Sequence, residues 1–150
     1  MELSVYPTPA PEDYVAVQHA YAVYAWALDI ADLATLEAMF TEDAVFEDTA
    51  GNVYPDRAAF LGYAKRLTAL PEFRGRQHHI DKLLIEAAED RIVCRTYWTV
   101  TKWFSGESRK VIEVTGWSKD VFRRTGEGLK FCERRVHYWR DVDCPWAKAG

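Results

Sequence analysis

Two adjacent histidines stand in the sequence GRQHHIDKLLIE, residues 75–86. An imidazole titrates near neutral pH, so a histidine that faces a cavity can act as a general base toward a substrate proton. Successive strand residues point to opposite faces of a sheet, so His78 and His79 cannot share one site. This alternation excludes a metal site built from both histidines, and it leaves His79, Asp81 and the distant His137 as an alternative ligand set without characteristic spacing.

The parity of this strand divides its residues into two sets. His78 is grouped with Ile80 and Leu84, and His79 is grouped with Ile85. Parity alone does not say which set faces a cavity. A lone histidine in a strand more often has a structural role, which is the alternative interpretation of both residues.

Asp29 lies near the C-terminal end of an apolar helical stretch, residues 12–30. The helix dipole disfavours a negative charge at this end by a few tenths to about 1 kcal/mol. A carboxylate that meets a histidine can accept a hydrogen bond from one ring nitrogen and leave the other nitrogen basic. The alternative is an exposed loop acid beside Asp32.

The elements that would position these residues follow from apolar periodicity. Apolar residues recur at steps of three and four through residues 12–30, which predicts a long helix whose stripe contains Tyr14, Val17, Tyr21, Tyr24 and Leu28. Asp32 can cap a short second helix. A short strand follows at 43–48, and a third helix begins after Pro55 and Asp56 and ends before Pro71.

The second half of the chain consists of predicted strands. Four segments, 77–87, 91–104, 109–123 and 129–140, are separated by turn signals, which is typical of an antiparallel meander. Helices come first and strands follow, so the predicted fold class is α+β.

The segment 91–104 carries apolar residues on both of its faces. Trp98 shares one parity with other apolar residues, and Tyr97 and Trp103 lie on the opposite face. A sheet with one wet face would not have this pattern, so we expect a homodimer in which a second copy covers the outer face.

Size, charge and cysteine content restrict the class of protein. The chain has 150 residues, which predicts a single domain over 1–150 with a core at about 11–140. The net charge of −4 comes without a basic stripe, so no nucleic acid partner is expected. Three dispersed cysteines, an N-terminal stretch unlike a signal peptide and the lack of a long apolar run favour a cytoplasmic protein without membrane contact.

Three stretches together resemble the SnoaL-like branch of the nuclear transport factor 2-like superfamily. They are YAVYAWALDIADLATLEAMFTEDAVFED, RQHHIDKLLI and GWSKDVFRRTGEGLKFCERRVHYW, and with the order of elements they extend the resemblance over residues 11–139. The resemblance implies a cone-shaped α+β barrel, in which N-terminal helices pack on a curved, mostly antiparallel sheet around a hydrophobic cavity.

The resemblance also implies roles for individual residues. Enzymes of this superfamily, including bile acid dehydratase, scytalone dehydratase and hexachlorocyclohexane dehydrochlorinase, use an aspartate from the first helix with a histidine from the first meander strand. Asp29 and His78 match these positions, and Tyr24 matches a tyrosine that polarises a carbonyl group. A cavity-facing arginine of some relatives corresponds best to Arg134, which would bind substrate, with the adjacent Arg135 as the alternative.

A cavity of this kind needs apolar walls. We expect these to include Phe46, Tyr63, Trp98 and Trp117, which would exclude water while Tyr24 donates to a developing oxyanion. Core packing is the alternative role of that tyrosine. The sequence also departs from the family, because Lys82 stands where the family motif often has asparagine.

The expected function is a cofactor-independent lyase or isomerase of the dehydratase, dehydrohalogenase or cyclase type. The substrate would be a small hydrophobic cyclic molecule, aromatic and polycyclic compounds included, and neither a cofactor nor a metal is expected. The alternative is a non-catalytic ligand-binding or assembly subunit that resembles the β-subunit of ring-hydroxylating dioxygenases.

Overall fold

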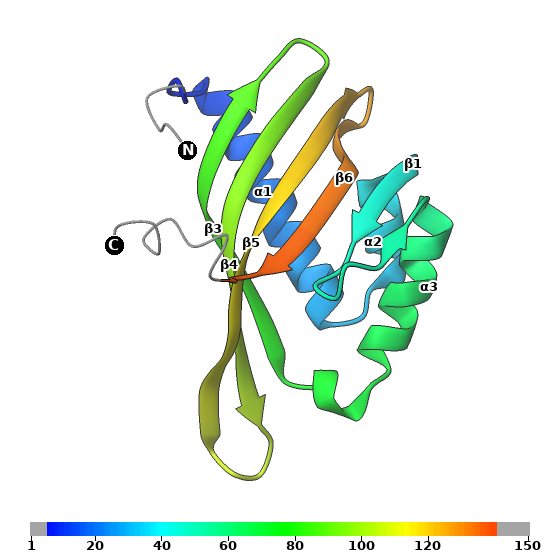
Figure 1. Cartoon of the computed structure of the whole chain (residues 1–150), viewed down its shortest axis with the longest axis vertical. Coiled ribbons are helices and arrows are strands. Elements are labelled where there is room, and N and C mark those ends of the chain that lie inside the picture. Colours follow the sequence, from blue (N-terminus) through cyan, green and yellow to red (C-terminus); the bar gives the residue numbers. More distant parts are fainter. Residues whose placement is uncertain (1–5, 141–150) are drawn as a thin grey trace.

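Three α-helices lie against a six-stranded curved sheet in the computed structural model, which describes residues 6–140 (Figure 1). The helices are α1 (Pro11–Asp29), α2 (Leu33–Met39) and α3 (Arg57–Thr68), and a 3-10 turn, η2 (Pro71–Phe73), follows them. The strands are β1 (Phe40–Glu47), β2 (Val53–Tyr54), β3 (Arg76–Ala87), β4 (Arg91–Phe104), β5 (Arg109–Thr125) and β6 (Gly128–Tyr138). The predicted α+β class is confirmed.

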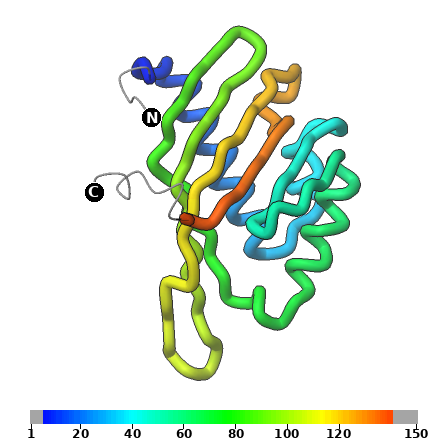
Figure 2. Tube along the Cα trace, in the orientation of Figure 1, coloured from blue at the N-terminus to red at the C-terminus, as the bar shows by residue number. Residues whose placement is uncertain are grey.

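The sheet has the strand order β2-β1-β6-β5-β4-β3. Neighbouring strands from β6 to β3 are antiparallel, which confirms the predicted meander, whereas β1 pairs with β6 in parallel. Sequence periodicity did not predict the two-residue strand β2 or this parallel pair. The ends of β4 and β5 extend past the rest of the molecule as a long hairpin (Figure 2).

A Schellman motif ends α1 immediately after Asp29. The N–H of Asp32 donates to the carbonyl of Ala27 at 2.8 Å, and the N–H of Ala31 donates to that of Leu28 at 3.2 Å. Ala31 has a φ of 59°, the left-handed conformation that the motif requires. The side chain of Asp32 then accepts from the backbone N–H at the start of α2, as the sequence predicted. The turn thus fixes where the helix stops and where the Asp29 side chain projects.

Apolar side chains fill the space between the helices and the sheet, with Phe40, Phe122 and Phe131 fully buried at its centre. The predicted stripe of α1 is part of this core at four of its five positions. Tyr14 is the exception, because its side chain lies one turn from the helix start and is 40% exposed.

A β-bulge interrupts β3 between Asp81 and Leu84. Lys82 adopts a φ of 55° there, and the extra residue reverses the parity of the strand. Ile85 is therefore buried in the core, whereas Leu84 is only half-buried. The predicted grouping of His78 with Leu84 is wrong for this reason. The left-handed conformation at Lys82 also gives a reason for the asparagine of related sequences, since asparagine tolerates this conformation best after glycine.

Candidate active site

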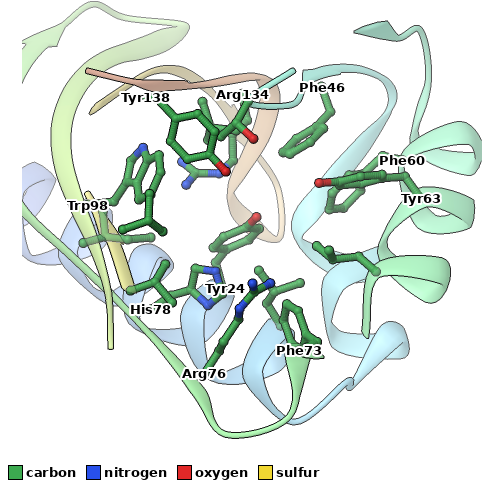
Figure 3. A pocket seen from close by; sticks show the side chains of 17 residues that line it. Tyr24, Phe46, Phe60, Tyr63, Phe73, Arg76, His78, Trp98, Arg134 and Tyr138 are labelled. Carbon is green, nitrogen blue, oxygen red and sulfur yellow. The ribbon is translucent and has the colours of Figure 1, made fainter. Parts of the chain in front are cut away.

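A cavity of about 140 Å³ lies between the helices and the inner face of the sheet. Its walls are largely aromatic, with Trp98 on one side and Phe46 and Tyr63 across from it (Figure 3). Three of the four predicted aromatic wall residues are thus in place. The predicted residues Tyr24, His78 and Arg134 also line the cavity.

Asp29 and His78, the predicted catalytic pair, are in direct contact. Oδ1 of Asp29 lies 2.5 Å from Nδ1 of His78, and Oδ2 of Asp29 accepts the backbone N–H of His78 at 2.9 Å. The two side chains retain only 15% and 19% of their accessible surface. A carboxylate can only accept, so this contact places the ring proton on Nδ1 and leaves Nε2 as the basic nitrogen.

The surroundings of His78 orient the ring further. Phe73 from η2 stacks on it with ring centroids 5.9 Å apart. His79 points to the opposite face, as strand alternation predicts, and its Nε2 lies 2.9 Å from the hydroxyl of Thr101. Only His78 of the two adjacent histidines therefore belongs to the cavity.

Tyr24 projects from the C-terminal half of α1 into the cavity, between the His78 side and the Phe46 side (Figure 3). Burial raises the pKa of its phenol, and the nearby Arg134 cation opposes that rise. The guanidinium carbon of Arg134 lies 4.5 Å from the centroid of the Tyr24 ring. Tyr24 is therefore a neutral hydroxyl donor next to a fixed cation.

Arg134 rather than Arg135 faces the cavity. Its Nη1 lies 2.5 Å from Oδ2 of Asp120, which is fully buried on β5. Arg135 points to the other face of β6, where it pairs with Glu47 and Glu133. Strand alternation requires this separation, since adjacent residues of a strand face opposite sides.

The prediction that Trp117 lines the cavity is wrong. Trp117 pairs across β4 with Tyr97 and across β6 with His137, and all three share the outer face of the sheet. Its ring lies 4.5 Å from that of His137. Its neighbour Gly116 occupies the cavity face instead, where a Cβ would meet the indole of Trp98 at 2.2 Å. The absence of a side chain at Gly116 therefore makes room for Trp98.

Sequence reasoning missed two charged residues of the site, Arg76 and Asp120. Arg76 lies two residues before His78 on the same face of β3 and lines the cavity. The alternation of SKDVF, residues 118–122, was the available signal for Asp120, because it places this carboxylate on the buried face with Phe122. A charge on a buried face implies a partner, which here is Arg134.

Within residues 6–140, no group of three or more His, Cys, Asp or Glu side chains is arranged to hold a metal ion. The same part of the chain contains no helix that is long and apolar enough to cross a membrane.

Comparison with known structures identifies the fold. The chain is similar to Aln2 from a Streptomyces species, with 26% identity and a TM-score of 0.81 over 88% of this chain and 94% of that chain. It is also similar to ActVI-ORFA from Streptomyces coelicolor, with 24% identity and a TM-score of 0.73 over 83% and 96% of the two chains.

A third similar structure is a candidate dehydratase of the NTF2-like family from Streptomyces avermitilis, with 15% identity and a TM-score of 0.76 over 87% and 99% of the chains. Other similar structures are described as NTF2-like or as having a cystatin-like fold, which confirms the expected fold. A comparison with curated proteins gives no match. Residues 10–135 match the family model of the SnoaL-like domain. The chain therefore belongs to the SnoaL-like domain family.

Proposed function

We propose that this protein is a lyase or isomerase that removes a proton next to a carbonyl group of a small cyclic substrate. The observation that carries the proposal is the contact of 2.5 Å between Asp29 and His78 at the wall of an aromatic cavity. The family supports the proposal, because SnoaL-like proteins include polyketide cyclases and dehydratases. We place the protein in the cytoplasm as part of the same proposal.

The reaction begins with the substrate ring between the aromatic walls. Nε2 of His78 takes the proton from carbon, and the Asp29 carboxylate stabilises the imidazolium that forms. The electron pair of the broken C–H bond moves toward the carbonyl oxygen, where the hydroxyl of Tyr24 and the guanidinium of Arg134 stabilise the developing negative charge.

The enolate then has two outcomes that form no new carbon–carbon bond. Departure of a hydroxide or halide from the β-carbon gives the unsaturated ketone, and the proton on His78 can accompany the hydroxide as water. Where the substrate carries a C=C bond conjugated with the enolate, return of that proton to the far carbon of the dienolate gives the isomer. Base and oxyanion donor both come from the chain, so neither outcome requires a cofactor. Cyclisation through attack of the enolate on a second carbonyl uses the same groups.

The geometry favours this proposal over a non-catalytic binding or assembly subunit. A subunit without chemistry has no use for a carboxylate that fixes one tautomer of a cavity histidine, and an aspartate in such a subunit would be free to face solvent. Asp29 instead directs both of its oxygens to His78. The contact with His78 then gives a reason for an aspartate at the C-terminal end of a helix, where the helix dipole disfavours a negative charge.

Hydrogen exchange in D₂O tests the proton abstraction without knowledge of the leaving group. Small cyclic ketones are incubated with the protein, and NMR follows the loss of their α-protons. We expect exchange above the buffer rate that disappears in His78→Ala and persists in His79→Ala. Exchange at the buffer rate for a panel of ketones that bind the cavity would refute the proposal.

A further inference from the structure

Tyr63 of α3 contributes a hydroxyl group to the cavity as well as an aromatic ring. Figure 3 shows this hydroxyl pointing into the cavity from the α3 side, apart from His78 and Arg134. The proposed proton abstraction uses the hydroxyl of Tyr24 and makes no use of that of Tyr63. The cavity therefore has a hydrogen-bonding group that the removal of the proton does not require.

Two neighbouring aromatic rings hold the ring of Tyr63 in place. Its centroid lies 4.7 Å from that of Tyr54 and 5.5 Å from that of Phe46. The hydroxyl of Tyr54 donates to Oδ2 of Asp48 at 3.1 Å, and Oδ1 of this carboxylate accepts the backbone N–H of Asn52 at 2.9 Å. The turn between β1 and β2 thus anchors Tyr54, which packs against Tyr63. The hydroxyl of Tyr63 is therefore presented to a ligand in a fixed direction.

The hydroxyl of Tyr63 is a neutral group without a partner in the protein. Burial raises the pKa of this phenol, so it keeps its proton at neutral pH and can both donate and accept a hydrogen bond. Among residues 6–140 it forms no hydrogen bond with another residue. The hydroxyl of Tyr138 also points into the cavity, but that side chain is 46% exposed and solvent can satisfy it. A ring that fills the cavity would shield Tyr63 from solvent, so the ligand itself must supply the partner of this hydroxyl.

We infer that the hydroxyl of Tyr63 binds a hydroxyl group on the ring of the substrate, so that the substrate class is a hydroxylated cyclic ketone. A hydroxyl group suits Tyr63 because either oxygen can donate to the other. An analogue without this group would leave Tyr63 unpaired, which is how a polar site rejects such analogues. The inference rests on the proposed function for the carbonyl group, and it adds the second group that the site recognises.

Hydroxyacetophenones test the inference, because they carry a carbonyl group and a hydroxyl group on a single ring. The cavity volume of about 140 Å³ is close to that of an engineered cavity of about 150 Å³ that holds benzene, so probes with a single ring match its size. The matched probes are 3′- and 4′-methylacetophenone, which have the same shape without the hydroxyl group. Calorimetric titration near neutral pH should show at least ~10-fold tighter binding of one hydroxy isomer than of its methyl counterpart, because the methyl group leaves Tyr63 unpaired.

Three variants assign this preference to Tyr63. Tyr63→Phe should reduce the preference for the hydroxy isomer to less than ~3-fold and should leave the affinity for the methyl counterpart within ~3-fold. Tyr24→Phe should weaken both probes to a similar extent, because both carry the carbonyl group. The matched control Tyr14→Phe removes the hydroxyl of a 40% exposed side chain outside the cavity and should change neither affinity.

The comparison in the unaltered protein does not depend on the folding of any variant. Equal affinities for the hydroxy and methyl probes would overturn the inference, and so would a preference that survives in folded Tyr63→Phe. The same probes in D₂O report exchange of their acetyl protons. Exchange without the preference would refute only the role of Tyr63, whereas the preference without exchange would support that role and refute only the base role of His78.

Discussion

Oδ2 of Asp29 accepts the backbone N–H of His78 at 2.9 Å while Oδ1 of the same carboxylate lies 2.5 Å from Nδ1 of the ring. The backbone contact fixes the carboxylate, and the fixed carboxylate fixes the ring. This two-point contact joins the last residue of α1 to β3 across 49 positions of sequence. The position and orientation of the His78 ring therefore depend on where the first helix ends.

The two adjacent histidines should differ sharply in their effect on turnover. His78→Ala removes the general base and should lower kcat at least ~10²-fold once a substrate is known. His79→Ala removes only a contact with Thr101 on the other face and should leave kcat within ~3-fold. Steady-state kinetics of both folded variants check this. Full activity of His78→Ala would exclude the mechanism.

Asp29→Asn should inactivate the enzyme by changing the tautomer of His78. The amide oxygen of the new side chain must accept the backbone N–H, so its NH₂ group faces Nδ1. Nδ1 then becomes an acceptor and the ring proton moves to Nε2, which can no longer act as a base. We expect at least ~10²-fold loss of kcat. Nitrogen NMR of labelled His78 reports the tautomer directly, and a ring that keeps its Nδ1 proton would contradict this account.

Double substitution of this pair should be far from additive. Once His78→Ala has removed the base, Asp29→Asn has no ring left to orient and should add little further loss of kcat. Losses that multiply would mean that the two residues act in separate steps.

Ala31→Gly should stabilise the protein. Ala31 is the left-handed residue of the turn after α1, and an alanine there carries a strain of about 1 kcal/mol that glycine avoids. We expect Tm to rise by roughly 2–4 °C, the range for a domain of this size. The matched control Ala16→Gly, at an exposed position inside α1, should lower stability by about 0.5–1 kcal/mol. A loss of stability in both variants would contradict the role given to Ala31.

The sequence predicted the helices and strands of the site more accurately than it predicted the charged residues of the site. Helix periodicity and strand alternation are local patterns, and they placed Tyr24 on the buried stripe of α1 and Trp98 on the opposite face of β4 from Tyr97. The choice of His78 over His79 came from the family resemblance.

The errors have nonlocal causes. The bulge at Lys82 reverses the parity of β3. Trp117 was assigned to the inner face without knowledge of how β5 pairs with β4. The role of Asp120 follows only from its ion pair with Arg134 on the next strand. Only the family resemblance brought Asp29 and His78 together, since no local pattern links a helix end to a distant strand.

The raised pKa values of two buried tyrosines should make the free energy of unfolding fall at alkaline pH. Burial raises the pKa of Tyr24, and that of Tyr21 even further, above the ordinary value of 10.0. Above pH 10 the unfolded chain therefore releases protons that the folded protein keeps. The free energy of unfolding should be unaffected by these groups below pH 10 and should fall as the pH rises beyond it. Tyrosinate absorbance should show that Tyr21 and Tyr24 ionise only when the protein unfolds. Comparison with Tyr21→Phe and Tyr24→Phe assigns the signals, and ionisation of either residue in the folded protein near pH 10 would refute this.

The outer face of the sheet should form a homodimer. Tyr97 and Trp103 are 42% and 46% exposed there, which is unusual for large aromatic side chains on one surface. Burial of this face by a second copy predicts a dimer at micromolar concentration in sedimentation velocity experiments. Tyr97→Arg should shift the population toward monomer, because it places a charge in the centre of the contact. Leu70→Arg, at an exposed apolar residue after α3, is the matched control and should leave the dimer intact. A monomer in the unaltered protein would rule the dimer out and leave these aromatic side chains to another partner.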